Sequence, residues 1–281
     1  MPLEERNNQI NELNKKAILK LDNINNNTST SHNMLRRSQI TTNTQKSIFH
    51  SMITLSSGKY FYNLDTINQE HIYATIIDEK DIDPSIPEWK AAIDLELKTL
   101  SDKNTWSIVD SDTIPKLQKP LKYKWVFSRK VNIFNKNIYK ARLTVKGCSQ
   151  VYGINFKETF SPVAQITTFR LILSLCAAMG LEAYQMDVQN AFPNASLHNV
   201  EIYMVPPPQL NLPAGKLLKL LRALYGLKQA SREWFLLLSS ILTSLGFKIC
   251  KSDSCLFFMI KNDNFLIIVA HVDDMLVVSN K

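Results

Sequence analysis

The stretch Phe265-Leu-Ile-Ile-Val-Ala-His-Val-Asp-Asp-Met-Leu-Val-Val278 decides the fold, because two apolar, β-prone runs flank a pair of carboxylates. Such runs predict two antiparallel strands, with Asp273 and Asp274 at the tip of the hairpin that they form. Adjacent carboxylates in apolar surroundings repel each other, so a divalent cation is a natural partner. A plain acidic turn explains the same pattern, because Asp is a common turn residue.

A third acidic residue ends another predicted strand. Residues 181–188 form this strand, and Asp187 lies near its end, just before Val188-Gln-Asn-Ala-Phe192. If the strand neighbours the hairpin in one sheet, three carboxylates converge. Three oxygen ligands on a rigid sheet suit a pair of Mg2+ ions about 3.5–4 Å apart, an arrangement used in phosphoryl transfer. A strand-ending residue without a ligand is the alternative for Asp187.

The composition predicts a soluble globular protein. The chain has 281 residues, of which 45% are hydrophobic, so it can bury one good core and a second small one. Its longest apolar run is too short to span a bilayer, so neither secretion nor membrane insertion is expected. The four cysteines, Cys148, Cys176, Cys250 and Cys255, form no CxxC pair and are interpreted as free thiols of a reducing compartment.

Positive charge is concentrated in the second part of the chain. Residues 91–281 hold 23 Lys+Arg against 14 Asp+Glu, within a net charge of +8 for the whole chain. Residues 119–146 contain nine basic residues, no acidic residue and several aromatic residues, on two predicted strands that form a hairpin. This mixture suits phosphate backbones or a triphosphate. A solvated basic face is the plainer interpretation.

Residues 1–83 are predicted to be a largely disordered, linker-like segment, because the asparagine-rich stretch 23–33 cannot bury enough surface to order itself. The folded body is expected at 84–281. Its first helix would begin with Ser85 as the cap and Pro87 in the first turn.

Two further helices are predicted from apolar residues at helical spacing. One begins at Thr167 and ends at Gly180, and the other begins at Ser231 and ends at Gly246. Their apolar sides consist of Leu171, Leu175, Ala178 and Met179 in the first and of Trp234, Leu238, Ile241 and Leu245 in the second. Because strands and helices alternate irregularly, we expect an α+β fold, a sheet with helices packed on one face.

The chain resembles the reverse transcriptase domain of copia-type LTR retrotransposons over roughly residues 89–280. Each motif is weak alone, but their order and spacing together are specific. The motifs are Trp89-Lys-Ala-Ala, Asn104-Thr-Trp106, Lys124-Trp-Val-Phe127, Tyr139-Lys-Ala-Arg-Leu143, Lys146-Gly147, Glu158-Thr-Phe-Ser-Pro-Val163, Gln185-Met-Asp-Val188, Ala191-Phe192, Ile202-Tyr-Met204, Leu224-Tyr-Gly-Leu-Lys-Gln-Ala230 and His271-Val-Asp-Asp-Met275.

The resemblance implies an RNA-directed DNA polymerase of right-hand shape. It places a basic fingers hairpin at 119–147 and an antiparallel palm sheet within 165–281. It also implies that the sequence stops after the catalytic Asp-Asp motif, so that no thumb is expected. The whole would be part of a retrotransposon Pol polyprotein that adds deoxynucleotides (dNTPs) to a primer 3′-hydroxyl on an RNA or DNA template.

The resemblance also implies roles for individual residues. Asp187, Asp273 and Asp274 would be the catalytic triad and hold two Mg2+ ions, with Mn2+ as an alternative and Asp274 as the less direct ligand. The dNTP would be bound by Lys130, Arg142, Phe192, Tyr225 and Gly226, and the template and primer by Lys228 and His271. Phe192 matches an aromatic gate against the ribose 2′-hydroxyl. A core aromatic is the alternative interpretation of Phe192.

The same resemblance implies a location in the cytoplasm, within a retrotransposon particle, and it allows a nuclear location and association with other Pol products. Four residues depart from the family pattern: His271 replaces Tyr, Pro193 replaces Leu, Ala195 replaces Gly and Ser231 replaces Pro. None of them removes an expected metal ligand. Because the resemblance places His271 close to the primer end, a catalytically inactive, nucleic-acid-binding remnant of the same fold is the alternative function.

Overall fold

The computed structural model describes residues 53–54, 74–77, 82–83, 86–131, 136–198 and 200–280. The predicted disorder of residues 1–83 and the predicted cap Ser85 fall almost entirely outside these residues. The helices are α3 (Pro87–Asp102), α4 (Ile166–Met179), α5 (Ala191–Asn194) and α6 (Ala230–Ser244), with 3-10 turns at Gly147–Ser149 and Pro208–Leu210. The strands are β1 (Ile53–Thr54), β2 (Ala74–Ile77), β3 (Trp106–Asp110), β4 (Tyr123–Val131), β5 (Asn137–Val145), β6 (Glu182–Val188), β7 (Ile202–Met204), β8 (Lys216–Leu220), β9 (Lys248–Ile249), β10 (Leu256–Lys261), β11 (Asn264–His271) and β12 (Asp274–Ser279).

The described chain divides into two compact units. The first contains 161–191 and 235–280 together with β1, and the second contains the described residues of 63–160 and 192–234. The division of 84–281 into fingers and palm stays a prediction. The fold is a mixture of helices and antiparallel sheets, as expected, and the described residues form three sheets.

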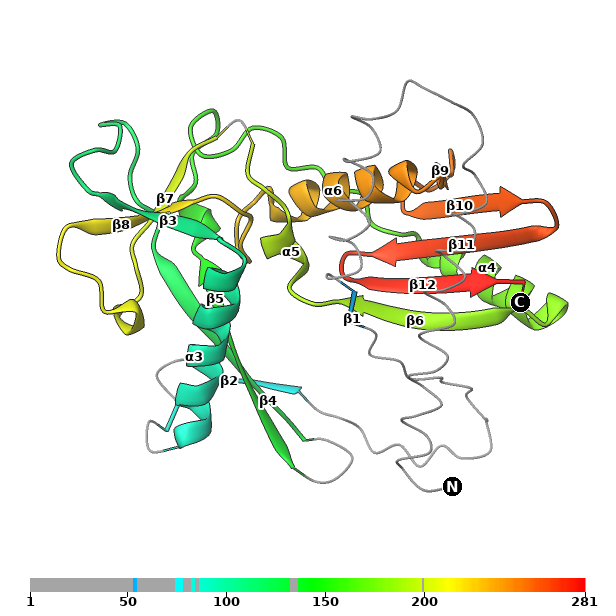
Figure 1. The fold of residues 1–281 in the computed structure, drawn as a ribbon, viewed down its shortest axis with the longest axis horizontal. Helices are drawn as coiled ribbons and strands as arrows, with labels where there is room; N and C mark the ends of the chain where they lie inside the picture. The colour runs from blue at the N-terminus through cyan, green and yellow to red at the C-terminus, as the bar shows by residue number, and fades with distance from the viewer. Residues whose placement is uncertain are drawn as a thin grey trace, which may run out of the picture. The chain divides into compact units, whose positions relative to one another are not determined.

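The first unit is built on a six-stranded antiparallel sheet with the strand order β1-β6-β12-β11-β10-β9. Figure 1 shows β6, β12, β11 and β10 side by side in it. The predicted hairpin is confirmed as β11 and β12, which pair from Leu266 opposite Ser279 to His271 opposite Asp274. The alternation of apolar residues along β-strands places Val269 and Val278 on the face that packs against α4.

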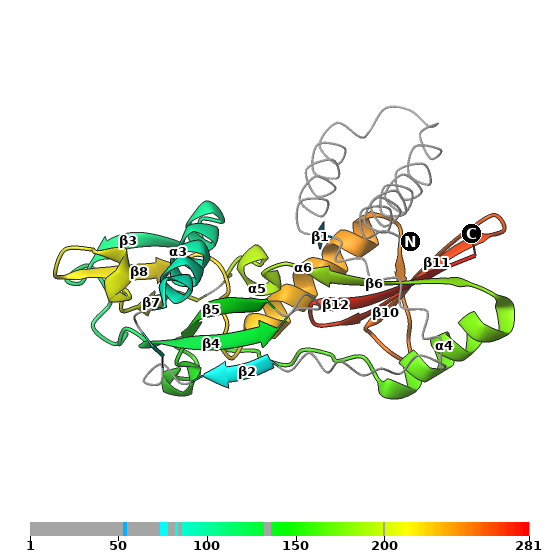
Figure 2. The same cartoon turned by 90° about the horizontal axis from the view of Figure 1, so that it is seen from below.

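Helix α4 covers one face of this sheet (Figure 2) through Ile172 and Cys176, which are buried against Val269 and Val278. The apolar side predicted for this helix is largely exposed, with Leu171 at 59% and Met179 at 60%. A helix rich in apolar residues on several sides gives no unique inward face from sequence alone. Gly180 ends the helix in the left-handed conformation, as predicted, at φ 62°.

The start of α4 is held by a residue from elsewhere in the chain. The predicted cap Thr167 is wrong: the helix begins at Ile166, and its N-cap Gln165 makes no side-chain cap bond. Instead, the buried carboxylate of Asp253 accepts hydrogen bonds from the backbone N–H of Gln165 at 3.0 Å and the hydroxyl of Thr168 at 2.6 Å. Burial raises the pKa of Asp253, but these bonds and one from the Cys255 N–H outweigh it and hold that pKa below its ordinary value.

Replacing Asp253 by Asn should lower the free energy of unfolding by about 1–3 kcal/mol at pH 7, because a buried charge-assisted cap is lost. Since the folded-state pKa is depressed, this stabilisation is present above the unfolded-state pKa of about 3.9 and is lost as the pH falls through the folded-state pKa. Urea unfolding should therefore separate wild type and variant at pH 7 and bring them together in acid. Asp263→Asn, in an exposed turn of the same sheet, is the matched control; a gap for Asp253→Asn that persists in acid would contradict the argument.

The second unit contains two three-stranded antiparallel sheets, with the orders β2-β4-β5 and β3-β8-β7. Strands β4 and β5 are the predicted basic hairpin, and they pair from Tyr123 opposite Val145 to Val131 opposite Asn137. Their inward face packs on α3, where the Trp89 ring makes edge contacts with Phe127 at 5.3 Å and with Tyr139 at 4.7 Å.

Strand β5 is an edge strand of its sheet. A carboxylate from α3 binds one of its free backbone N–H groups. Glu96 is buried and accepts a hydrogen bond from the Leu143 N–H at 3.2 Å. Burial raises the pKa of Glu96, and this bond and the nearby Lys140 and Arg142 oppose that rise. The contact satisfies an edge donor that would otherwise remain unpaired inside the protein.

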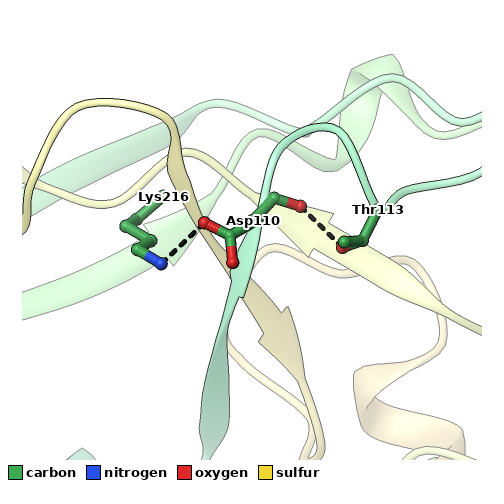
Figure 3. Close-up of polar contacts among 3 residues, drawn as sticks. All are labelled: Asp110, Thr113 and Lys216. Carbon is green, nitrogen blue, oxygen red and sulfur yellow. Dashed lines mark hydrogen bonds and ion pairs between the residues drawn. The ribbon is translucent and has the colours of Figure 1, made fainter.

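Strands β3 and β8 hold each other through their backbones and through a surface ion pair. Lys216 donates to the Asp110 carboxylate at 2.6 Å, and the Thr113 hydroxyl donates to the Asp110 carbonyl at 2.7 Å (Figure 3). Both ends of the ion pair are substantially exposed, so it contributes little to stability.

The third predicted helix is confirmed as α6, one residue longer at its start than predicted. Its predicted stripe of Trp234, Leu238, Ile241 and Leu245 is buried. In the part of the chain that the structure describes, no helix is long and apolar enough to cross a membrane.

Candidate active site

The turn between β11 and β12 carries the acidic pair on a strained backbone. Val272 and Asp273 form the two-residue turn, and Asp274 begins β12. Val272 has φ 59°, a conformation that a β-branched residue rarely adopts and that typically costs about 1–3 kcal/mol. Two-residue hairpin turns usually place Asn, Asp or Gly at this first position. The strain is therefore concentrated next to the two carboxylates.

Strand register brings the third acidic residue to the same place. Asp187 of β6 lies directly opposite Asp274 of β12, and the Val188 N–H donates to the Asp273 carbonyl at 2.9 Å. Opposite residues of an antiparallel pair project from the same face, so Asp187 and Asp274 share one face of the sheet. The strand adjacency on which the three-carboxylate hypothesis depended is thus present.

The carboxylate groups themselves are not gathered into a complete ligand set. Among the described residues, no three or more His, Cys, Asp or Glu side chains lie close enough together to hold a metal ion. The Asp274 carboxylate accepts a long hydrogen bond, 3.4 Å, from the Gln185 amide. Convergence therefore holds for the strand positions and stays a prediction for the carboxylate oxygens.

His271 extends the same row. It ends β11, lies opposite Asp274 and is exposed, and its ring meets the Phe169 ring of α4 edge-on at 6.4 Å. His271, one of the four residues that depart from the family pattern, is therefore a direct neighbour of the acidic turn.

In the second unit, three of the residues assigned to nucleotide binding contact one another, with Arg142 stacked over Tyr225 and Phe192 edge-on to it. The Arg142 guanidinium lies over the Tyr225 ring, 5.0 Å from its centroid, and the Phe192 ring meets Tyr225 at 4.7 Å and 66°. The Nε of Arg142 is buried and has no acceptor in the described part of the chain. A guanidinium held over an aromatic ring is suited to an anionic group through its terminal N–H groups.

Lys130 does not join this stack. On the outer face of the hairpin Lys130 pairs with Ile138, whereas Arg142 pairs with Val126, four positions before Lys130 in β4. Four residues of strand span about 13 Å. Lys130 is exposed near the far end of the hairpin.

Gly226 takes part in a close backbone crossing. It has φ 89°, and a Cβ atom there would lie 2.0 Å from the Val145 carbonyl oxygen; a Cβ on Gly147 would lie 2.0 Å from the Gly226 carbonyl oxygen. The Val145 N–H donates to the Tyr225 carbonyl at 2.8 Å at the same crossing. The two glycines thus let β5 and the Tyr225 loop touch, which places Arg142 beside Tyr225.

A buried amide network that the sequence analysis missed supports the same loop. The Gln150 amide donates to Gln229 Oε1 at 2.9 Å, and the Gln229 amide donates to the Asn155 carbonyl at 2.9 Å. Gln150 Oε1 accepts from the Lys228 N–H at 2.8 Å, and all three amide side chains are buried. Gln229 lies within a family motif, but nothing in the sequence pattern marked Gln150 or Asn155 as its partners.

Lys228 is exposed but its ammonium group is held in place. It donates to the Gln150 carbonyl at 3.3 Å and lies 4.5 Å from the centroid of the Phe156 ring. A cation fixed at the protein surface is suited to a phosphate group.

Comparison with known proteins agrees with these features. Residues 103–281 match the family model described as reverse transcriptase (RNA-dependent DNA polymerase). The chain therefore belongs to the reverse transcriptase family.

Its relatives place it more closely within that family. It is 43% identical over 192 residues to the Retrovirus-related Pol polyprotein from transposon TNT 1-94 of Nicotiana tabacum, covering 66% of this chain and 14% of that protein. It is 34% identical over 196 residues to the corresponding protein from transposon RE1 of Arabidopsis thaliana, covering 68% and 13%. A Transposon Ty1-H Gag-Pol polyprotein of Saccharomyces cerevisiae is 32% identical over 156 residues, covering 52% and 8%. The domain is thus of the kind found in copia-like retrotransposons, and the match spans only a small part of each relative; no solved structure gives a significant match.

Proposed function

We propose that this chain forms the fingers and palm of an RNA-directed DNA polymerase that transfers nucleotides from dNTPs to a primer 3′-hydroxyl. The observation that carries the proposal is the register that sets Asp187 opposite Asp274, with Asp273 in the adjoining strained turn. Strain of this kind persists where the surrounding structure imposes it, commonly at functional sites. Family membership supplies the reaction class.

Carboxylates at neighbouring strand ends have the donor chemistry that Mg2+ prefers, with Mn2+ as an alternative. Asp187 and Asp273 would be the main ligands, and Asp274, whose carboxylate also meets Gln185, the less direct one. Two such ions would activate the attacking 3′-hydroxyl and stabilise the leaving pyrophosphate. The contribution of the chain is to hold negative charge at fixed positions on a rigid sheet.

The second unit would bind the other reactants. Arg142 would receive the triphosphate, and Tyr225 and Phe192 would form the wall against the sugar, with Phe192 excluding the ribose 2′-hydroxyl. Lys228 would contact the template and Lys130 the outer end of the triphosphate. In the first unit, His271 would contact the primer end. Template, primer and dNTPs would be the partners, with association with other Pol products allowed by the length of the relatives.

Primer extension on an RNA template is the test of this function. The chain should add dNTPs to an annealed primer in the presence of Mg2+ or Mn2+, and addition should stop with EDTA. Binding of primer-template without extension in either metal would instead support the inactive, nucleic-acid-binding remnant.

Replacing Arg142 by Gln should raise the KM for dNTP by at least about tenfold while leaving the Kd for primer-template nearly unchanged, because the guanidinium that lies over Tyr225 would no longer be there to bind the triphosphate. Arg142→Lys should give a KM for dNTP between those of wild type and Arg142→Gln, since it keeps the charge and loses the planar guanidinium over the ring. The matched control is Lys124→Gln, the same charge change on the same face of the hairpin. It should weaken primer-template binding slightly and reduce its salt dependence. Equal effects of both variants on both measurements would count against the triphosphate role.

A further inference from the structure

A single buried residue ties the short helix of Phe192 to two cations, one through its side chain and one through its backbone. Asn194 is the last residue of α5 and is 6% exposed. Its side-chain Oδ1 accepts a hydrogen bond from the Lys103 ammonium, and its carbonyl accepts one from Arg222 Nη1 at 2.8 Å. Hydrogen bonds from charged donors are about twice as strong as neutral ones.

The two cations come from elements that the fold locks together. Lys103 is the C-cap of α3, and Arg222 follows β8 by two residues. Strands β3 and β8 pair with Trp106 opposite Leu220, and the backbone N–H groups of Leu221 and Arg222 both donate to the Thr105 carbonyl, at 2.8 and 3.1 Å. Asn194 is thus held from a rigid frame.

Helix α5 needs such support, because four residues make one turn, which is unstable in isolation. Backbone bonds both close the turn and join it to the frame: the Ala195 N–H donates to the Phe192 carbonyl within the turn, and the Ala223 N–H, three residues after β8, donates to the Ala195 carbonyl, both at 2.9 Å. The segment that contains Ala223 leads directly to Tyr225, on which the Phe192 ring rests at 4.7 Å. The Asn194 anchor and the Phe192–Tyr225 contact therefore fix α5 from its two sides.

Without the side-chain oxygen of Asn194, the charged form of Lys103 would be unfavourable at this place. Burial, and secondarily the nearby Arg222, lower the pKa of Lys103, which means that the protein disfavours its charged form. The Asn194 oxygen is the acceptor that offsets this repulsion. Loss of the oxygen should therefore move the lysine as well as α5.

We propose that Asn194, held by Lys103 and Arg222, is a positioning residue that fixes Phe192 and thereby sets the selectivity for deoxyribose over ribose in the incoming nucleotide. The inference rests on the proposed polymerase function and on Phe192 as the gate. Asn194 itself touches no reactant; it acts through the placement of α5.

The test combines single-nucleotide incorporation with hydrogen exchange. The ratio of kcat/KM for a dNTP to that for the matching rNTP should fall about tenfold in Asn194→Ala, because a gate displaced by a fraction of an ångström discriminates less. Asn194→Asp keeps a side-chain acceptor of the same shape for Lys103, leaves the backbone bond to Arg222 in place, and should retain the wild-type ratio. Lys103→Met removes the donor of the Lys103–Asn194 hydrogen bond instead of the acceptor, and it should also lower the ratio, by less than Asn194→Ala does. The matched control is Lys216→Met, which removes the surface ion pair with Asp110 in the same unit and should leave the ratio unchanged.

Hydrogen exchange gives a readout that does not need activity. In Asn194→Ala, the Ala195 and Ala223 amides should lose protection at least about tenfold, whereas the β3–β8 amides should keep theirs, and Asn194→Asp should resemble wild type. Unchanged protection, or an unchanged sugar ratio in both Asn194→Ala and Lys103→Met, would overturn the inference. If wild type adds no nucleotide of either kind, the proposed function fails, and the exchange result alone decides whether Asn194 holds α5.

Discussion

Replacing Asp273 by Asn is expected to lower the rate of nucleotide addition by roughly three orders of magnitude, because Asn keeps the shape of the side chain but removes the negative charge that a metal ion requires. Asp187→Asn should have an effect of the same size, since Asp187 sits on the adjoining strand opposite Asp274. Asp274→Asn should lower the rate only about tenfold, because Asp274 is the less direct ligand. The measurement is single-turnover primer extension with saturating Mg2+ and dNTP.

A matched control for these variants exists in the same sheet. Asp263 lies in the turn between β10 and β11, at the other end of β11 from Asp273. Asp263→Asn makes the same chemical change in a hairpin turn and should leave the rate unchanged. A rate for Asp273→Asn within tenfold of wild type, or a comparable loss in Asp263→Asn, would contradict the assignment of the acidic pair. The urea midpoints of the four variants should stay close to wild type, which separates loss of a ligand from loss of the fold.

The sequence predicted the elements of this site better than it predicted their arrangement. The β11–β12 hairpin followed from two apolar runs around a polar turn, a local pattern with a physical cause in burial and turn chemistry. The pairing of β6 with β12 is a contact between residues almost ninety positions apart, and no local periodicity encodes it. Family resemblance suggested that Asp187 belongs with Asp273 and Asp274, and the strand register then showed the adjacency of the strands.

Other features depended on packing that sequence patterns do not specify. Leu171 and Met179 formed the predicted apolar side of α4, yet the helix buries Ile172 and Cys176, because apolar residues occur around most of its circumference. Asp253 caps α4 from a loop some ninety residues away, so no capping pattern near the helix could reveal it. Asn194 and Gln150 were invisible for the same reason: an amide becomes a structural anchor only through distant partners.

Gly226 illustrates how a residue assigned to nucleotide binding can have a structural requirement of its own. Replacing it by Ala should lower the free energy of unfolding of the second unit by more than about 3 kcal/mol, because the new Cβ would lie 2.0 Å from the Val145 carbonyl oxygen at φ 89°. The neighbours of this Cβ are backbone atoms that β5 holds by its pairing with β4, so they cannot move aside cheaply. Unfolding in urea, followed by tryptophan fluorescence, measures the change.

Gly153→Ala separates the collision from the backbone conformation. Gly153 has φ 80°, close to that of Gly226, but a Cβ there meets nothing within 4 Å. Gly153→Ala should therefore lower the free energy of unfolding by only about 1–2 kcal/mol, the usual penalty for a non-glycine residue in the left-handed region. Similar losses in Gly226→Ala and Gly153→Ala would show that the crossing is not tight.

The two interpretations of Gly226 predict different kinetic results as well. If Gly226 serves only to let a nucleotide approach the backbone, its Ala variant should remain stable and show a raised KM for dNTP. If the crossing is what brings Arg142 to Tyr225, the variant should lose stability and also lose the Val145–Tyr225 hydrogen bond, which is 2.8 Å long in the native fold. Gly147→Ala then provides an independent check, because its Cβ, in the 3-10 turn that follows β5, would strike the Gly226 carbonyl oxygen at 2.0 Å. We expect the two Ala variants to be destabilised alike; a stable Gly147→Ala protein with normal dNTP use would refute the crossing as the support of the Arg142–Tyr225 stack.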